Sequence, residues 1–270
     1  MGLRILVTND DGYARARDEE PNPEDGDITG TLPNERINWV NSHPVTAARF
    51  GLDLFGPMLW SDKPCDLVIS GPSWGWNTGY NVWGSGTLNI AQYAAVKRNI
   101  PAIAVSAQDA HPHSKGAAAV LYAGLVTKLV EALVEPGKPL LPENVWLSVH
   151  FPVLRRPVPK EDDFKWVLAR IEGNSEFLCS WKVKSLVDDG TFDNCDLDNL
   201  PAEQTVLSRC LNRICISINT DGQRSAPRED QILVKERLNG LLACSRGGQG
   251  GYDSRSTSAN VDGEHHAEEA

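Results

Sequence analysis

Two adjacent carboxylates near the start of the chain are the residues best suited to do chemistry. Asp10 and Asp11 directly follow a short apolar segment, residues 3–8, and precede Gly12. Open α/β sheets place their ligand crevice at the carboxyl ends of strands, where carboxylate oxygens can hold a hard divalent cation such as Mg²⁺. Asp-Gly is also a hairpin signal, but the charged residues 13–20 offer no second apolar strand. The pattern therefore favours a metal site over a surface turn.

Further polar residues follow a second apolar segment, residues 67–70. A loop rich in Gly, Trp and Asn comes next and contains Asn77, which either donates to a phosphate or stabilises a turn. Ser85, Gly86 and Thr87 then open a helix, where free backbone amides and the helix dipole favour a phosphate. Ordinary N-capping by a hydroxyl is the alternative for this tripeptide.

Apolar periodicity predicts the elements that position these residues. Expected strands are 3–8, 67–70, 100–106, 145–149, 164–171 and 214–218; expected helices are 88–98, 114–135 and 230–242; expected loops are 13–35 and 71–84. Strand, helix and strand in succession over residues 67–106 make a parallel βαβ unit. The predicted fold class is therefore α/β, with a Rossmann-like, doubly wound and mostly parallel sheet. The charged loop 13–35 is an anomaly, because it supplies no crossover after the first strand.

The composition limits the classes of partner. The chain has 270 residues, with 26 Lys+Arg against 36 Asp+Glu and a net charge of −10. This balance argues against binding a nucleic acid duplex or an anionic membrane, and no stretch approaches the roughly 20 apolar residues of a membrane span. We expect one domain over 1–244, with a core at 1–152 and a smaller C-terminal extension at 153–244. The Gly-, Ser- and acid-rich residues 245–270 are expected to be a disordered tail.

The start of the chain and its cysteines favour different compartments. No signal peptide precedes the first strand, which predicts a cytoplasmic protein as written. The back half, however, holds most of the cysteines, without a Cys-x-x-Cys pair, which disfavours zinc and suits disulfides in an oxidising compartment. These cysteines are Cys179, Cys195, Cys210, Cys215 and Cys244. The protein would be secreted if a signal peptide is missing from this chain.

The order and spacing of these motifs resemble the SurE family of survival-protein nucleotidases and acid phosphatases. The shared segments are the opening at 5–12, the strand 67–71 with Gly-x-Asn-x-Gly at 75–79, Ser-Gly-Thr at 85–87 and the strand 100–106. Residues 41–46 followed by Gly51 are similar to the fungal branch in particular. The resemblance is dense over residues 3–12 and 37–106 and weaker from there to about Cys244.

The resemblance implies a metal-dependent phosphomonoesterase with a Rossmann-like sheet and a carboxyl-terminal oligomerisation arm. Asp10 and Asp11 match its metal ligands, and Mg²⁺ or Mn²⁺ is the implied cofactor. The implied substrate-contacting residues are Asn9, Asn77, Ser85, Gly86 and Thr87. Two departures stand out. Ser73 occupies the position, two residues after Gly71, of an Asn ligand, and a helix, strand and serine loop are missing from the shortened N-terminal region.

The expected activity is hydrolysis of a nucleoside monophosphate or similar phosphomonoester by a metal-activated water, with the chain as a homo-oligomer. The alternative is a catalytically impaired remnant that keeps the phosphate cradle but not the metal geometry. An aromatic group follows the expected strand 67–70 and either stacks against a base or other aromatic substrate, covers the mouth of the sheet, or packs in a subunit interface; it consists of Trp74, Trp76, Tyr80 and Trp83. The histidines, among them His150, are interpreted as structural or surface residues, because no carboxylate is paired with them in the sequence.

Overall fold

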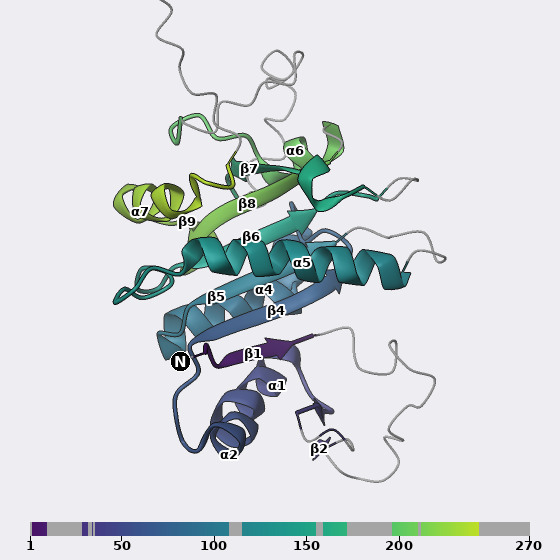
Figure 1. Cartoon of the computed structure of the whole chain (residues 1–270), viewed down its shortest axis with the longest axis vertical. Coiled ribbons are helices and arrows are strands. Elements are labelled where there is room, and N and C mark those ends of the chain that lie inside the picture. The colour runs from purple at the N-terminus through teal and green to yellow at the C-terminus, as the bar shows by residue number, and fades with distance from the viewer. Residues whose placement is uncertain are drawn as a thin grey trace, which may run out of the picture.

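A seven-stranded sheet with helices on both faces forms the centre of the computed structural model (Figure 1). The structure describes residues 2–9, 29–31, 34, 36–107, 115–154, 159–171, 196–209 and 212–242. Strand order is β1-β4-β5-β6-β8-β7, with β9 paired to β8. The strands are β1 (Ile5–Thr8), β4 (Leu67–Trp74), β5 (Ala102–Ala107), β6 (Trp146–Phe151), β7 (Lys165–Ala169), β8 (Arg213–Thr220) and β9 (Arg224–Ser225).

The sheet is mostly parallel. β1, β4, β5 and β6 all run in the same direction, whereas β8 is antiparallel to β6 and parallel to β7. Parallel strands need covering helices on both faces, and the chain supplies them. The predicted α/β class with a Rossmann-like, mostly parallel sheet is thereby confirmed.

Helices pack on each face. They are α1 (Pro44–Phe50), α2 (Gly56–Trp60), α3 (Asn81–Gly84), α4 (Gly86–Gln92), α5 (Lys115–Leu133), α6 (Glu203–Arg209) and α7 (Arg228–Leu238). Shorter turns of other helix types are η3 (Gly51–Phe55), η4 (Tyr93–Lys97) and η6 (Glu161–Asp163). In Figure 1, α5 lies across the face toward the viewer and α4 lies behind the sheet. Leu125 of α5 and Val234 of α7 share one core cluster, and Leu88 of α4 belongs to another.

The two faces of the sheet differ in chemistry because side chains alternate along a strand. On β6, Leu147, Val149 and Phe151 pack into the cluster beneath α5. The intervening residues face α4 and α6, and among them Ser148 and His150 are polar and buried. The α4 and α6 face therefore carries buried polar groups within an otherwise apolar layer.

Several boundaries differ from the predictions for local reasons. β4 continues past Ser70 to Trp74, where a loop was predicted, because its second half resumes pairing with β5 after a register shift. The helix predicted over 88–98 consists of α4 and the π-helical η4, and it stops where Asn99 takes a left-handed φ of 51°. The last helix occupies Arg228–Leu238 instead of 230–242.

The predicted loop over 13–35 contains a strand, so this prediction is wrong in part. β2 (Thr29–Thr31) pairs antiparallel with β3 (Asn38–Val40) in a separate two-stranded sheet. Thr-Gly-Thr is too short to give a periodic signal, which explains why it was missed. Within the described part of the chain, β1 pairs with β4 alone, so one edge of the main sheet ends at β1.

The disulfide expectation is wrong for Cys215. This residue is a free cysteine, fully buried in β8, and burial raises the pKa of its thiol. Its side chain packs in an apolar cluster with Val167 and Val206. Cys65 is free as well. The remaining cysteines, Cys179, Cys195, Cys210 and Cys244, and the predicted tail 245–270 lie outside the described residues. Among the helices that the structure describes, none is long and apolar enough to cross a membrane.

Candidate functional site

The carboxyl ends of the four parallel strands meet at one edge of the sheet, where ligand crevices form in open α/β folds. Asn9 follows the end of β1. Ser73, Ser106 and His150 lie in register at the ends of β4, β5 and β6. All three side chains of this row are buried. The fold thus gathers polar groups from segments as far apart in sequence as Asn9 and His150.

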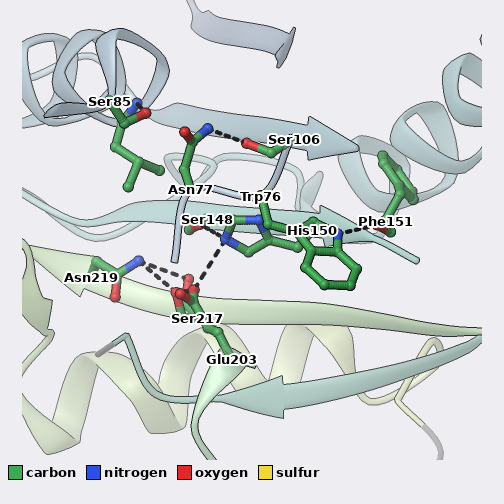
Figure 2. A network of polar contacts seen from close by, with 11 residues as sticks. Trp76, Asn77, Ser85, Ser106, Ser148, His150, Phe151, Glu203, Ser217 and Asn219 are labelled. Carbon is green, nitrogen blue, oxygen red and sulfur yellow. Dashed lines mark hydrogen bonds and ion pairs between the residues drawn. The ribbon is translucent and has the colours of Figure 1, made fainter. Parts of the chain in front are cut away.

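The loop between β4 and α3 is fastened to the ends of two strands (Figure 2). The Asn77 side-chain amide donates to Ser106 Oγ at 2.6 Å, and the Trp76 indole N–H donates to the Phe151 carbonyl at 3.0 Å. The Gly75 amide donates to the Ala107 carbonyl at 2.8 Å. Asn77 is therefore held at the carboxyl edge of the sheet.

Ser85, Gly86 and Thr87 begin α4, as predicted from the sequence. The Ser85 hydroxyl accepts a hydrogen bond from the Leu88 amide at 3.1 Å, so it acts as an N-cap. Thr87 is fully buried, and Gly86 is half-buried. What this segment offers an anion is consequently its backbone amides and the positive end of the helix dipole.

The candidate metal ligands are only partly described. Asp10 and Asp11 lie outside the described residues. The Asn9 side-chain amide donates to the Pro72 carbonyl at 3.1 Å, which brings the end of β1 beside the residue that precedes Ser73. Ser70 Oγ, on β4, is buried and has no hydrogen-bond partner among the residues that the structure describes. Within the described ranges, no group of three or more His, Cys, Asp or Glu could hold a metal ion.

A cavity of about 650 Å³ runs along the edge of β1. Residues of β1 through Asn9 line one side, and Trp39 of β3 and Trp60 of α2 line another. Gly71 and Pro72 close it beside Ser73. Its volume falls within the roughly 300–1,000 Å³ typical of small-molecule sites. Asn9, which precedes the two aspartates in the sequence, is one of its lining residues.

The comparison with protein families decides the relationship of this chain. The family model described as survival protein SurE matches residues 15–175, which is more than half of the chain. The chain belongs to the SurE family.

Individual SurE relatives match over part of their length. An acid phosphatase of Yarrowia lipolytica is 33% identical over 151 residues, which cover 52% of this chain and 42% of the relative. The 5'-nucleotidase SurE of Syntrophobacter fumaroxidans is 31% identical over 176 residues, 56% of this chain and 67% of that protein. Among solved structures, the SurE protein from Aquifex aeolicus aligns with a TM-score of 0.43 and 22% identity, over 63% of this chain and 72% of that one.

The aromatic residues around the Asn77 loop divide into two groups. Trp76 is half-buried and packs against the cluster that contains Val206 of α6. Trp74, Tyr80 and Trp83 are instead 48%, 63% and 53% exposed. The three exposed side chains face solvent more fully than Trp76, which also packs against the protein interior.

Sequence reasoning missed one pair in this SurE-family chain. His150, interpreted from the sequence as structural or surface, is fully buried and lies 3.6 Å from the carboxylate of Glu203, measured from Nε2 to Oε1. The two residues are far apart in sequence, and α6, which carries Glu203, was not predicted. The available signal was polar Ser148 and His150 interrupting an apolar strand. His111 and His113 lie outside the described residues.

Proposed function

We propose that this SurE-family chain hydrolyses phosphomonoesters with the help of a divalent metal ion. One observation carries the proposal: the end of β1 at Asn9, Ser73 of β4 and the Asn77–Ser106 pair lie along one edge of the sheet, and α4 packs against β4 and β5. The names of two relatives, acid phosphatase and 5'-nucleotidase, support this class of reaction.

Asp10 and Asp11, with Ser73 as a further ligand, would hold Mg²⁺ or Mn²⁺. The chemistry of this donor set fits, since carboxylate and hydroxyl oxygens suit a hard cation. The Ser70 hydroxyl of β4, buried and without a partner in the described part of the chain, adds an oxygen that can accept a hydrogen bond from a water ligand. When bound, such an ion polarises a phosphoryl oxygen and lowers the pKa of the attacking water.

The remaining residues bind and orient the substrate. An amide side chain has two N–H donors, and Asn77 uses one toward Ser106, so Ser106 fixes the direction of the other. The α4 backbone amides at Gly86 and Thr87 stabilise phosphate charge, and Asn9 borders the same corner. The cavity along β1 offers room for the organic part of the ester. A nucleoside monophosphate is the proposed substrate class.

Purified chain is expected to hydrolyse a general phosphomonoester such as p-nitrophenyl phosphate when Mg²⁺ or Mn²⁺ is present. Chelation is expected to remove the activity, and re-addition of metal to restore it, because the two carboxylates alone supply no Lewis acid. Turnover is measured by release of p-nitrophenol, with cooperative unfolding as proof of folded protein. A folded sample without turnover at any metal concentration would contradict the proposal.

A second candidate function is phosphate binding without catalysis. Ser73 favours it, because a short hydroxyl stands where the family resemblance implies an Asn, and because that hydroxyl is buried. This candidate predicts binding of inorganic phosphate that is independent of metal, together with no turnover. Titration calorimetry with and without a chelator separates the two functions.

Replacing Ser73 by Asn is expected to raise the apparent affinity for Mg²⁺. The Asn side chain is longer than that of Ser, and its carbonyl oxygen is a stronger metal ligand than a hydroxyl. The apparent dissociation constant for Mg²⁺ is therefore expected to fall about tenfold, a size typical of changes in the residues around a metal. Ser73→Ala is the matched variant and is expected to weaken the site. The measurement is the Mg²⁺ concentration at half-maximal turnover. Equal values for both variants would show that residue 73 does not contact the metal.

A further inference from the structure

A fully buried carboxylate faces a fully buried imidazole beneath the Asn77 loop. Glu203, the first residue of α6, places Oε1 3.6 Å from His150 Nε2 and accepts a hydrogen bond from Ser217 Oγ at 2.5 Å. Ser148 Oγ lies 2.9 Å from the same imidazole nitrogen. Neither side chain has any solvent exposure. These polar contacts connect α6 with β6 and β8.

Stability does not explain the presence of this pair. Taking a carboxylate out of water is costly, and apolar side chains of similar volume often stabilise a protein equally well or better. Apolar residues do fill the neighbouring positions, such as Val206 and Cys215. Moreover, Glu203 Oε2 and His150 Nδ1 have no hydrogen-bond partner among the described residues. A role beyond packing is the more economical account.

The Glu203–His150 pair lies between two parts of the fold that contact the Asn77 loop (Figure 2). These two surfaces are the carboxyl ends of β5 and β6 and the start of α6. On one side, the loop is fastened to β5 and β6: Asn77 donates to Ser106, the register partner of His150, and Trp76 donates to the carbonyl of the residue after His150. On the other side, the loop meets α6. A Cβ added at Gly79 would lie 3.2 Å from Oε1 of Gln204, the residue after Glu203.

We propose that Glu203 and His150 are positioning residues for Asn77. By joining the start of α6 to the end of β6, they set the separation of the two surfaces that hold residues 75–80. That separation places the loop that carries Asn77, so that the Asn77 amide can reach Ser106, which orients it. The inference rests on the proposed function only for the role of Asn77 in binding phosphate. The placement of the loop itself does not depend on catalysis.

The first test uses Glu203→Gln, which keeps the shape of the side chain and removes its charge. Val234→Ala is the matched control, because Val234 is fully buried in α7 on the opposite face and its truncation loosens the fold away from the loop. Inorganic phosphate with Mg²⁺ is the probe. We expect Glu203→Gln to weaken its binding about tenfold, the size typical of lost supporting contacts, and Val234→Ala to leave it unchanged.

A double-mutant cycle distinguishes positioning from general destabilisation. If Glu203 acts through Asn77, Glu203→Gln causes no further loss of phosphate affinity once Asn77→Ala has been made, because coupled residues are not additive. Rescue provides a second readout: His150→Gln places an amide N–H toward Glu203, so this variant is expected to bind phosphate more tightly than His150→Leu. Additive losses in the cycle, or equal affinities of the two His150 variants, would overturn the proposal.

Amide hydrogen exchange over residues 75–80 gives a readout that does not require the proposed function. Faster exchange there in Glu203→Gln, but not in Val234→Ala, supports the positioning role, because local opening reports local stability. Unchanged exchange overturns it. If the wild-type chain binds no phosphate, the proposed function fails and the exchange comparison alone decides the inference. If Glu203→Gln does not fold, Ser217→Ala replaces it, since it removes only the hydroxyl that donates to Glu203.

Discussion

Replacement of Asp10 by Asn is expected to abolish metal-dependent phosphomonoester hydrolysis. The substitution keeps the size of the side chain but removes one of the two negative charges that follow Asn9. A catalytic metal supplies several kcal/mol of transition-state stabilisation, and each 1.4 kcal/mol or so is a factor of ten in rate. We therefore expect kcat/KM to fall by about 100-fold or more, as measured at saturating Mg²⁺.

Asp62→Asn is the control for this experiment. It makes the same chemical change at an exposed residue, and Asn tolerates the left-handed conformation that Asp62 adopts, with φ of 59°. The control is expected to retain wild-type kinetics, and both variants are expected to unfold at the wild-type temperature. An Asp10→Asn protein with half of the wild-type kcat/KM or more would contradict a role for this carboxylate in metal binding.

The half of the fold with strong local signals could be predicted from the sequence. β5, β6 and α5 lie within a few residues of their predicted bounds, because continuous apolar runs and a long apolar stripe are clear signals. Asn99 and Gly137, residue types that commonly end helices, follow η4 and α5 and both have positive φ. Local chemistry was sufficient wherever an element is long and periodic.

The elements that were missed are short or depend on tertiary contacts. α1 and α2 span seven and five residues, and η3 continues the helical path between them. β2 has three residues, and α6 begins with a buried carboxylate that a sequence reading places on the surface. In each case the stabilising contacts come from distant parts of the chain, which periodicity does not report.

The candidate site shows the same division. Asn77, Ser85 and Thr87 could be selected from the sequence, because a glycine-rich loop and a helix start are local features. The partner of Asn77, Ser106, could not, since it lies on another strand and is specified by the β4–β5 register. The Glu203–His150 contact is of the same kind. Topology, rather than composition, determines which polar residues meet.

Trp146 is the residue whose truncation is expected to cost this fold the most stability. It is fully buried on β6, its Cα lies in register with Ala102 of β5 and Asn219 of β8, and its indole N–H donates to the Thr220 carbonyl at 3.1 Å. The residue thus stands where the parallel strands β1, β4, β5 and β6 meet β8 and β7, which run in the opposite direction. Loss of its side chain removes contacts to both halves at once.

Trp146→Ala is expected to lower the free energy of unfolding by about 5 kcal/mol. Burial of the indole accounts for roughly 3–5 kcal/mol in comparable substitutions, and an unpaired Thr220 carbonyl adds about 1 kcal/mol. Because whole domains are stable by only about 5–15 kcal/mol, a large fraction of the protein would unfold in mild denaturant. Urea titration followed by far-UV circular dichroism measures the change without relying on tryptophan emission.

Two tryptophan variants separate the contributions of packing and of the indole hydrogen bond. Trp146→Phe keeps an aromatic ring and loses the donor, so it is expected to cost about 1–2 kcal/mol. Trp83→Ala removes a 53% exposed side chain and is expected to cost less than about 1 kcal/mol. If Trp146→Ala cost no more than Trp83→Ala, the two halves of the sheet would be held together elsewhere. We expect Trp146→Ala to cost more stability than Trp146→Phe, and Trp146→Phe more than Trp83→Ala. That result would make β6 the element on which both the sheet and the placement of the Asn77 loop depend.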